Sequence, residues 1–399
     1  MNLTLTEEQE MLTKSARSFM AEKFPREVLD QIDEGELGYS PEIWKEMAEM
    51  GWMGLVFPEE YDGAGMVFQD LALLLEEIGR VRPITPFFST IILGGLPIME
   101  LGNEEQKQDL IPKIASGESI FTLALTESSA RYDAKGITMK ATASGDDYIL
   151  NGIKLLVPDA HVADYLICVA RTSEGAKPED GITIFIVEAK IPGISCSVQK
   201  ALNEDRVCEV VFKDVKVAKQ NILGKLDEGW NDVRRILDRA AVSKCCEMVG
   251  GAQRVLEISV AYAKERTQFG RSIGSFQAIQ HHCANMLMDV DSSKMITYEA
   301  VWRISEGLPY AIEAAMAKTW VSDAYRRVVL LGLQINGGSG LIVEHEMPRY
   351  FNGAKVAEIT FGDARFNRKL LANCLGYKKL TFPMDNSDLC ERQEGNILL

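Results

Sequence analysis

Histidine and glutamate residues that could bind a metal occur in two short segments, but their spacing does not suit a shared ion. His345 and Glu346 lack the second histidine of a zinc-protease helix, and Pro348 would break the helix that has to present both ligands. His281 and His282 are adjacent, so on a helix their side chains would point about 100° apart. The sequence therefore predicts no metal site.

Residues that suit phosphate binding occur singly, without a glycine-rich nucleotide motif. No Gly-x-Gly-x-x-Gly follows a strand pattern and opens a helix, and no Gly-Lys-Ser loop occurs. A nicotinamide site and a nucleotide-hydrolysis site therefore have no support. Taken alone, Arg266 and Gln277 are typical of a helix surface and Gly337-Gly338 is typical of a turn, so none of them identifies a site by itself.

The chain has 399 residues, enough for two or three packed regions that could bury a large cofactor. Its 43 basic and 58 acidic side chains give a net charge of −15, which disfavours binding to nucleic acids and to anionic membrane surfaces. The eight cysteines contain no Cys-x-x-Cys pair, and no apolar run approaches the length of a membrane span. We therefore expect a folded cytoplasmic protein with reduced thiols, no nucleic-acid partner and no membrane insertion.

Residues 1–118 are expected to form an all-α N-terminal domain. Thr6 and Gln9 have the spacing of a capping box, and Ser40-Pro41 supplies an N-cap followed by a proline at the first helical position. Apolar periodicity predicts two further helices, at Asp70–Arg80 and Glu104–Ser116.

Residues 119–225 change to short alternating runs separated by turn signals, which predicts an antiparallel β domain. The expected strands are Thr138–Ser144, Tyr148–Lys154, Tyr165–Val169, Ile182–Val187 and Glu209–Phe212. Residues 226–378 return to the helical period, and long helices joined by short loops favour a four-helix bundle. The expected helices are Val233–Arg266, Phe276–Glu306, Tyr310–Leu333 and Ala364–Leu375. Residues 379–399 have no sustained period and are expected to form a tail.

Several short segments resemble signatures of the acyl-CoA dehydrogenase family in both order and spacing. These segments are Phe57–Gly65, Leu101–Lys107, Leu125–Glu127, Phe212–Val215, Asn221–Gly224, Arg266–Gly270 with Phe276-Gln277, and Gln334–Gly338. The resemblance covers roughly residues 1–378. It implies an α+β fold with an N-terminal helical domain, a middle antiparallel β-barrel and a C-terminal four-helix bundle.

The resemblance implies that FAD binds at a subunit interface, with its flavin between the β domain and the bundle. Arg266 would then offer a planar cationic fork to the pyrophosphate, a task for which arginine suits better than lysine. Phe269 would pack nearby, and Gln277 would hydrogen-bond toward the adenine end.

The same resemblance assigns a second set of residues to the cofactor. Gln334, Gly337 and Gly338 are similar to the segment that reaches FAD from a neighbouring subunit, where glycines let the backbone approach closely. Thr126 and the main chain of Leu125 would donate hydrogen bonds to the pyrimidine side of the flavin. This arrangement implies at least a dimer.

The catalytic carboxylate of the family is missing from both of its usual positions. In the family, a glutamate removes the α-proton of an acyl-CoA thioester while the β-hydrogen leaves as hydride to the flavin. Phe361 stands at the usual glutamate position, and Ala240 stands at the alternative one. Leu156–Pro158 replaces the family's Trp-x-Thr on the flavin face. The backbone N–H of Phe361 could still donate to a thioester carbonyl.

Three accounts of the chemistry stay open. In the first, the chain is an active dehydrogenase with another base; Asp363 is the nearest candidate, although we favour a helix N-cap role for it. In the second, the chain is a base-lacking subunit of a hetero-oligomer whose sister chain supplies the base, which suits the rebuilt stretch Val157–Asp164. In the third, it is a non-dehydrogenating flavoprotein of the same fold that acts on an acyl-CoA.

The resemblance also implies partners. These are an acyl-CoA substrate, an electron-transfer flavoprotein, and further subunits in a homotetramer or in a heterotetramer with a sister subunit. Asp238 matches a position near the CoA nucleotide, and Arg239 could replace the arginine that usually accompanies it. A helix ion pair is an equally good interpretation of Asp238.

Overall fold

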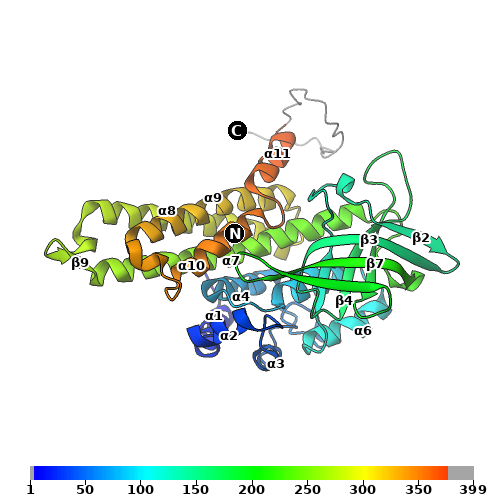
Figure 1. The fold of residues 1–399 in the computed structure, drawn as a ribbon, viewed down its shortest axis with the longest axis horizontal. Helices are drawn as coiled ribbons and strands as arrows, with labels where there is room; N and C mark the ends of the chain where they lie inside the picture. The colour runs from blue at the N-terminus through cyan, green and yellow to red at the C-terminus, as the bar shows by residue number, and fades with distance from the viewer. Residues whose placement is uncertain (1–3, 376–399) are drawn as a thin grey trace.

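The structure, a computed structural model, describes residues 4–375. Its N-terminal part is helical and follows the lower side of the molecule in Figure 1. The Thr6 side chain accepts from Gln9 N at 3.2 Å and that of Ser40 accepts from Ile43 N at 3.3 Å, which confirms both predicted helix starts. The helices are α1 Glu7–Lys23, α2 Arg26–Glu34, α3 Pro41–Glu49, α4 Phe68–Val81, α5 Leu96–Leu101 and α6 Glu104–Ala115.

The sequence did not predict α2, α5 or a third helical segment of this part. Phe88–Gly95 (η2) forms a π-helix that continues directly into α5. The segment is buried almost throughout, so it has no polar face and no periodicity to reveal it. A Cβ on Gly94 would lie 2.3 Å from the Phe121 Cβ, so glycine lets η2 pack directly against the β domain.

The middle of the chain forms an eight-stranded sheet with the order β6-β7-β3-β2-β4-β5-β8, with β1 paired to β4. Its strands are β1 Phe121–Ala124, β2 Lys140–Ser144, β3 Asp147–Pro158, β4 Tyr165–Arg171, β5 Ile182–Glu188, β6 Ile194–Lys200, β7 Arg206–Ala218 and β8 Ile222–Leu223. Most of its strand pairs are antiparallel, as predicted, but β4 pairs in parallel with β1 and, at one position, with β2. The prediction also missed β6, because most of its residues are exposed and it lacks a clear apolar alternation.

Long helices make up the C-terminal part: α7 Trp230–Glu265, α8 Gln277–Ser305, α9 Ala311–Asn336, α10 Met347–Ile359 and α11 Ala364–Cys374. Three long helices and the short final helix were predicted, whereas α10 was not, because Pro348 reads as a helix breaker. That proline is tolerated since it lies in the first turn of α10. A Cβ on Gly250 would lie 1.9 Å from the Glu76 carbonyl oxygen, so α7 and α4 cross with their backbones in contact.

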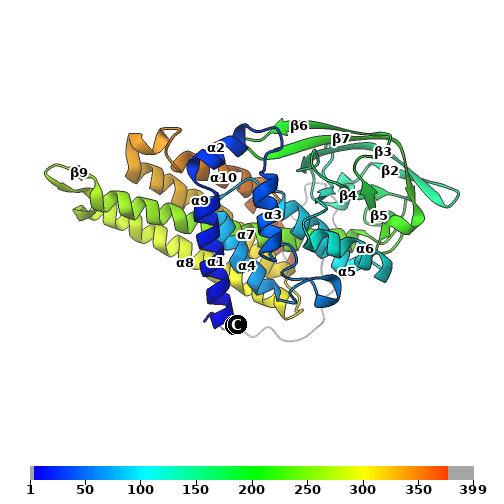
Figure 2. The ribbon, with the colours of Figure 1, turned by 90° about the horizontal axis from the view of Figure 1, so that it is seen from below.

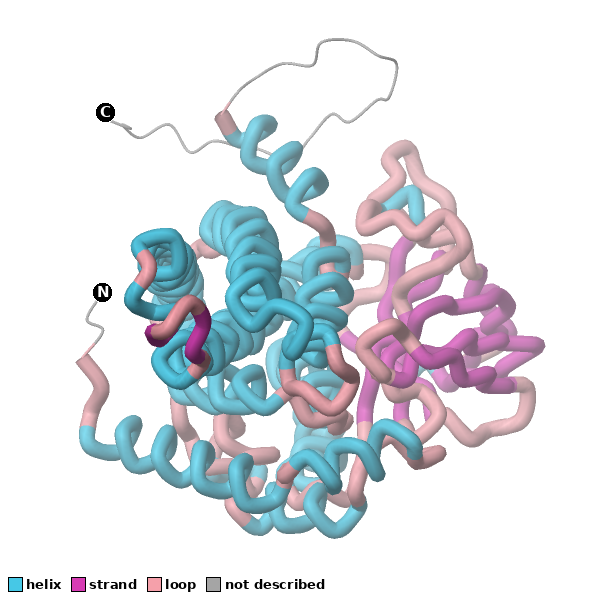
Figure 3. Tube along the Cα trace, turned by 60° about the vertical axis from the view of Figure 1, so that its left-hand side comes forward, coloured by secondary structure: helices cyan, strands magenta, loops and turns pink. Residues whose placement is uncertain are grey.

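These parts divide the molecule into a helical side and a sheet side. Figure 3 shows the strands gathered on one side, with helices packed against them. Figure 2 places β9, the two-residue strand Thr267–Gln268 after α7, at the end of the molecule farthest from the sheet. The predicted tail, 379–399, lies outside the described residues.

Candidate functional site

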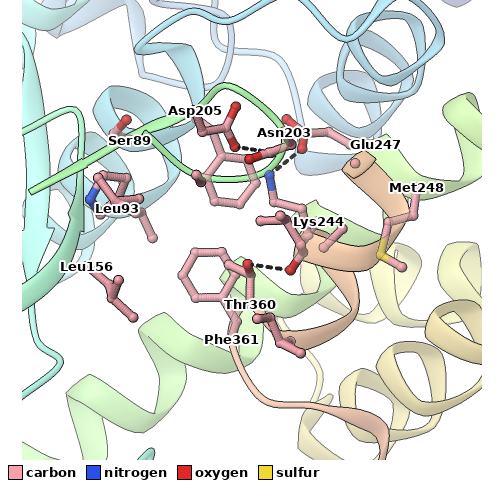
Figure 4. A pocket seen from close by; sticks show the side chains of 18 of the residues that line it. Ser89, Leu93, Leu156, Asn203, Asp205, Lys244, Glu247, Met248, Thr360 and Phe361 are labelled. Carbon is pink, nitrogen blue, oxygen red and sulfur yellow. Dashed lines mark hydrogen bonds and ion pairs between the residues drawn. The ribbon is translucent and has the colours of Figure 1, made fainter. Parts of the chain in front are cut away.

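A cavity of about 880 Å³ lies where the sheet meets the helices. Its walls come from α4, η2, the end of β1, the end of β3, the β6–β7 turn, α7, and the segment from α10 to α11. Most of the lining is apolar, with a few charged groups among it (Figure 4). A largely apolar cavity with a few convergent polar groups is the usual form of a small-molecule site.

Six residues named from the sequence line this cavity: Leu125, Thr126, Leu156, Pro158, Phe361 and Asp363. The alternative base position, Ala240, does not line it. Ala240 is fully buried within α7.

The predicted substrate residues on α7 are both in ion pairs. Asp238 pairs with Arg234 at 2.9 Å, and its burial raises its pKa to about 6 against the opposing effect of Arg234. Arg239 pairs with Glu100 at 2.5 Å. Neither residue lines the cavity, which favours the ion-pair interpretation of Asp238.

A buried ion pair holds the edge that carries Leu125 and Thr126. The Lys154 Nζ donates to the Leu125 carbonyl at 3.1 Å and to Glu127 Oε1 at 2.8 Å, and Leu155 N donates to the Thr126 carbonyl at 2.8 Å. Burial is the largest influence on Glu127 and opposes its ionisation, but the Lys154 cation together with hydrogen bonds from Thr138 and Met139 lowers the pKa of that carboxyl. The edge is therefore fixed by groups that do not themselves face the cavity.

Phe361 occupies the cavity wall in a strained turn. Its φ is +58°, a conformation that a bulky residue rarely adopts, and its ring stacks on Phe88 at a centroid distance of 5.5 Å. Burial raises the pKa of the Tyr132 phenol, and the nearby backbone of Phe361 partly opposes this. The role of the Phe361 N–H as a donor to a thioester carbonyl stays a prediction.

Asp363 serves as a helix cap. Its carboxylate accepts from Phe366 N at 2.7 Å, and it is the N-cap of α11. The N-cap interpretation of Asp363 is therefore confirmed.

Asp159 is a cavity residue that the sequence did not single out. Its backbone is left-handed, with φ +53°, and its carboxyl group accepts a hydrogen bond from the Ser89 hydroxyl. Burial raises the pKa of Asp159 to about 7, which Ser89 and Lys244 only partly oppose. Asp159 lies inside the stretch Val157–Asp164 that departs from the family pattern, which was the only signal pointing to it.

This burial predicts a pH-dependent stability. Because the pKa of Asp159 is raised in the folded state, its protonated form stabilises the fold, and this contribution is lost as pH rises toward and through about 7. We expect Asp159→Asn to gain stability relative to the native chain between pH 5 and pH 8, by about 3 kcal/mol at most, because about two pH units below the folded pKa contribute. Urea unfolding at both pH values measures it. An equal difference at the two pH values would contradict the assignment.

The remaining FAD residues named from the sequence lie together at the opposite end of the bundle. Arg266 and Gln277 are exposed where α7 ends and α8 begins, and the Phe269 side chain is 91% exposed. Gln334 and Gly337 lie nearby at the end of α9, where Tyr262 and Ser339 are hydrogen-bonded at 3.4 Å. A single face of the molecule thus presents these residues to the outside.

Gly337 and Gly338 have no steric reason within this chain to be glycine. A Cβ on either residue would meet nothing within 4 Å, although φ +57° with ψ −142° at Gly337 is itself a conformation for glycine. The open space suits the close approach of a ligand or of another chain.

The two groups of residues lie far apart within one chain. From Met248, the last α7 residue on the cavity, to Arg266 the helix rises about 27 Å. This separation fits the position between two subunits that the sequence predicts for FAD, which stays a prediction. Exposed apolar side chains beside the far group, Leu341 and Val343, suit a buried position in an assembly.

Known proteins match the chain along almost its whole described length. Residues 6–118, 122–215 and 227–375 match the N-terminal, middle and C-terminal domains of acyl-CoA dehydrogenase. The chain belongs to the acyl-CoA dehydrogenase family. The probable acyl-CoA dehydrogenase YngJ of Bacillus subtilis (strain 168) is 34% identical over 382 residues, which cover 94% of this chain and 100% of YngJ.

One further relative and one solved structure of the family are similar to this chain along most of its length. The caffeyl-CoA reductase-Etf complex subunit CarC of Acetobacterium woodii is 31% identical and covers 93% of this chain and 98% of its own length. The structure of butyryl-CoA dehydrogenase from Megasphaera elsdenii has a TM-score of 0.89 at 30% identity, and covers 94% of this chain and 100% of its own. The predicted family, its fold and its class as an FAD-dependent oxidoreductase are confirmed.

Membrane insertion has no support among residues 4–375. None of the helices there combines the length and the apolar character needed to cross a bilayer.

Proposed function

We propose that the cavity is a site for FAD-dependent α,β-dehydrogenation of an acyl-CoA thioester, with electrons passing to an electron-transfer flavoprotein. The observation that carries this proposal is the cavity itself, because it brings Thr126 and Phe361 together in a chain that matches the family throughout. The α-carbon loses a proton and the β-carbon loses a hydride, so a C=C bond forms. When bound, FAD supplies the two-electron oxidant.

The chain's own residues would orient and polarise the thioester. The edge at Leu125 and Thr126, fixed by Lys154, supports hydrogen bonding to the flavin. Tyr132 lines the cavity and keeps its proton because burial raises the pKa of the phenol. We infer that the Tyr132 O–H donates to the thioester carbonyl.

The absence of a base in this chain supports a second candidate function, in which the chain is the base-lacking subunit of a hetero-oligomer. Phe361 and Ala240 occupy the two family base positions, and Asp363 caps α11. By contrast, the residues at the far end of the bundle, which one chain would contribute to the FAD site of its neighbour, match the family motifs. Arg266 and Gln334 are among them. A chain that lacks the base but retains these FAD residues can complete the FAD site of a sister chain that carries the base.

Three points from the sequence stay predictions. These are the domain boundaries at 118/119, 225/226 and 378/379, the location in the cytoplasm, and the choice between homotetramer and heterotetramer.

Anaerobic reduction of the flavin tests the proposed activity. We expect an acyl-CoA to bleach the flavin absorbance of the FAD-loaded protein, and electron-transfer flavoprotein to restore it. If the chain purified alone stays unbleached but bleaches when a sister chain is bound, the second candidate holds. If neither form is bleached by any acyl-CoA, the proposed activity fails.

A further inference from the structure

One end of the cavity is polar although most of its wall is apolar. Figure 4 shows Asn203, Asp205, Lys244 and Glu247 gathered on one side of the cavity, across from Phe361. We call the polar end the set Ser89, Asp159, Asn203, Asp205, Lys244 and Glu247. A cavity built for a plain hydrocarbon chain gains nothing from polar groups, because burying them costs free energy unless each finds a partner.

Each donor group of the polar end already has one partner. Asn203 Nδ2 donates to Asp205 at 2.5 Å, and Ser89 donates to Asp159. The Lys244 ammonium pairs with Glu247 and lies 4.0 Å from the centre of the Phe88 ring. The Lys244 ammonium carries three N–H bonds and the Asn203 amide two, so the polar end can still donate to a ligand as well as accept from it.

Two buried polar atoms on the cavity have no partner. Asn203 is 8% exposed, and its Oδ1 accepts no hydrogen bond. Tyr325 is 2% exposed, and its hydroxyl is likewise unpaired. Buried polar atoms are rarely left without a partner, so these two atoms indicate that a ligand supplies the missing hydrogen bonds.

The charge of the polar end selects among ligands. Its three acidic groups, Asp159, Asp205 and Glu247, face a single ammonium, Lys244. The three guanidinium groups on the cavity have partners of their own: Arg82 donates to the Arg349 carbonyl, Arg206 to the Asp33 and Gly35 carbonyls, and Arg131 pairs with Asp133. A ligand carboxylate would thus meet like charges, and a ligand ammonium would meet Lys244. A neutral donor avoids both conflicts.

We propose that the acyl group of the substrate carries a hydroxyl at its far end, which donates to Asn203 Oδ1 in the polar end of the cavity. This proposal rests on the proposed function for the class of substrate, an acyl-CoA. It differs from that function in what it predicts: a preference between acyl groups, which binding alone can measure. Asp205 beside Asn203 provides a second acceptor for a mobile hydroxyl.

The experiment measures dissociation constants by calorimetry on the FAD-loaded protein in its native assembly. The probes are unbranched acyl-CoAs of four to ten carbons, each with its terminal hydroxyl and terminal carboxyl analogues. For at least one length we expect the hydroxyl form to bind about tenfold or more tightly than the plain form, because a site with an unpaired buried acceptor rejects ligands that leave it unpaired. The carboxyl form should bind more weakly than the hydroxyl form.

Variants of Asn203 test whether this residue carries the preference. In Asn203→Leu the ratio of the two dissociation constants should fall to about one while the plain form binds at least as well. Asn203→Asp keeps an acceptor and should keep the preference. Asn151→Leu alters an exposed asparagine of β3 that pairs with Asp214 of β7, and it should change nothing.

Each outcome bears on one proposal at a time. Plain chains that bind as tightly as every hydroxyl form, or a preference that survives in Asn203→Leu, would overturn the inference even if acyl-CoA bleaches the flavin. A hydroxyl preference that depends on Asn203 would support it even in a chain that bleaches only with a sister subunit.

Discussion

Replacing Phe361 with glutamate is expected to raise the rate at which acyl-CoA bleaches the flavin by about 100-fold or more. The Phe361 side chain lines the cavity and stacks on Phe88, so a carboxylate there would face the substrate from an apolar wall. Such a wall raises the pKa of a carboxyl group toward that of an effective base. Stopped-flow absorbance under anaerobic conditions, on the chain without any sister subunit, measures the gain.

Phe361→Gln is the matched control for this change. It has the shape of glutamate without its basicity, so it should leave the rate at the level of the native chain. Equal rates in both variants would show that a polar residue, rather than a base, was responsible. If Phe361→Glu keeps its FAD and binds acyl-CoA but gains no rate, the missing carboxylate is not what limits this chain.

Replacing Arg266 with alanine is expected to weaken FAD binding by about 10-fold to 100-fold, because a charge-assisted pair with the pyrophosphate is lost. Arg266 is exposed at the far end of the bundle and is not needed for packing in the chain itself. The loss should therefore appear in FAD affinity, measured by fluorescence titration, while thermal stability of the FAD-free protein stays unchanged.

Lys264→Ala is the control for charge at the same end of α7. Lys264 is also exposed and lies two residues earlier, so its removal should leave FAD affinity unaltered. Equal losses in both variants would mean that net charge, and not the guanidinium of Arg266, attracts the cofactor. Unchanged affinity in Arg266→Ala would remove this residue from the site.

The order of the three parts and the identity of most long elements could be predicted because local signals were strong. Thr6 and Ser40 are N-cap residues that predict helix starts. The apolar side chains of α7, α8 and α9 recur with the helical period over long stretches, which predicts these three helices. β1, η2 and α10 could not be predicted. Each owes its form to contacts with distant segments, such as the parallel pairing of Phe121 with Tyr165.

The candidate site was predictable only where it repeats a family motif. Thr126 and Phe361 were found in this way and do line one cavity. Asn203, Tyr132 and Asp159 were missed because they belong to turns that face the cavity only after the sheet has packed on the helices. Their burial and pairing, which give them their chemistry, are properties of tertiary structure.

Native mass spectrometry of the protein purified from its own cells tests the central claim, that FAD binds between the cavity of one chain and the far end of another. The account predicts FAD only on assemblies of two or more chains, and none on a monomer released from them. A monomer that retains FAD, or assemblies that carry none and take up none when FAD is added, would contradict it.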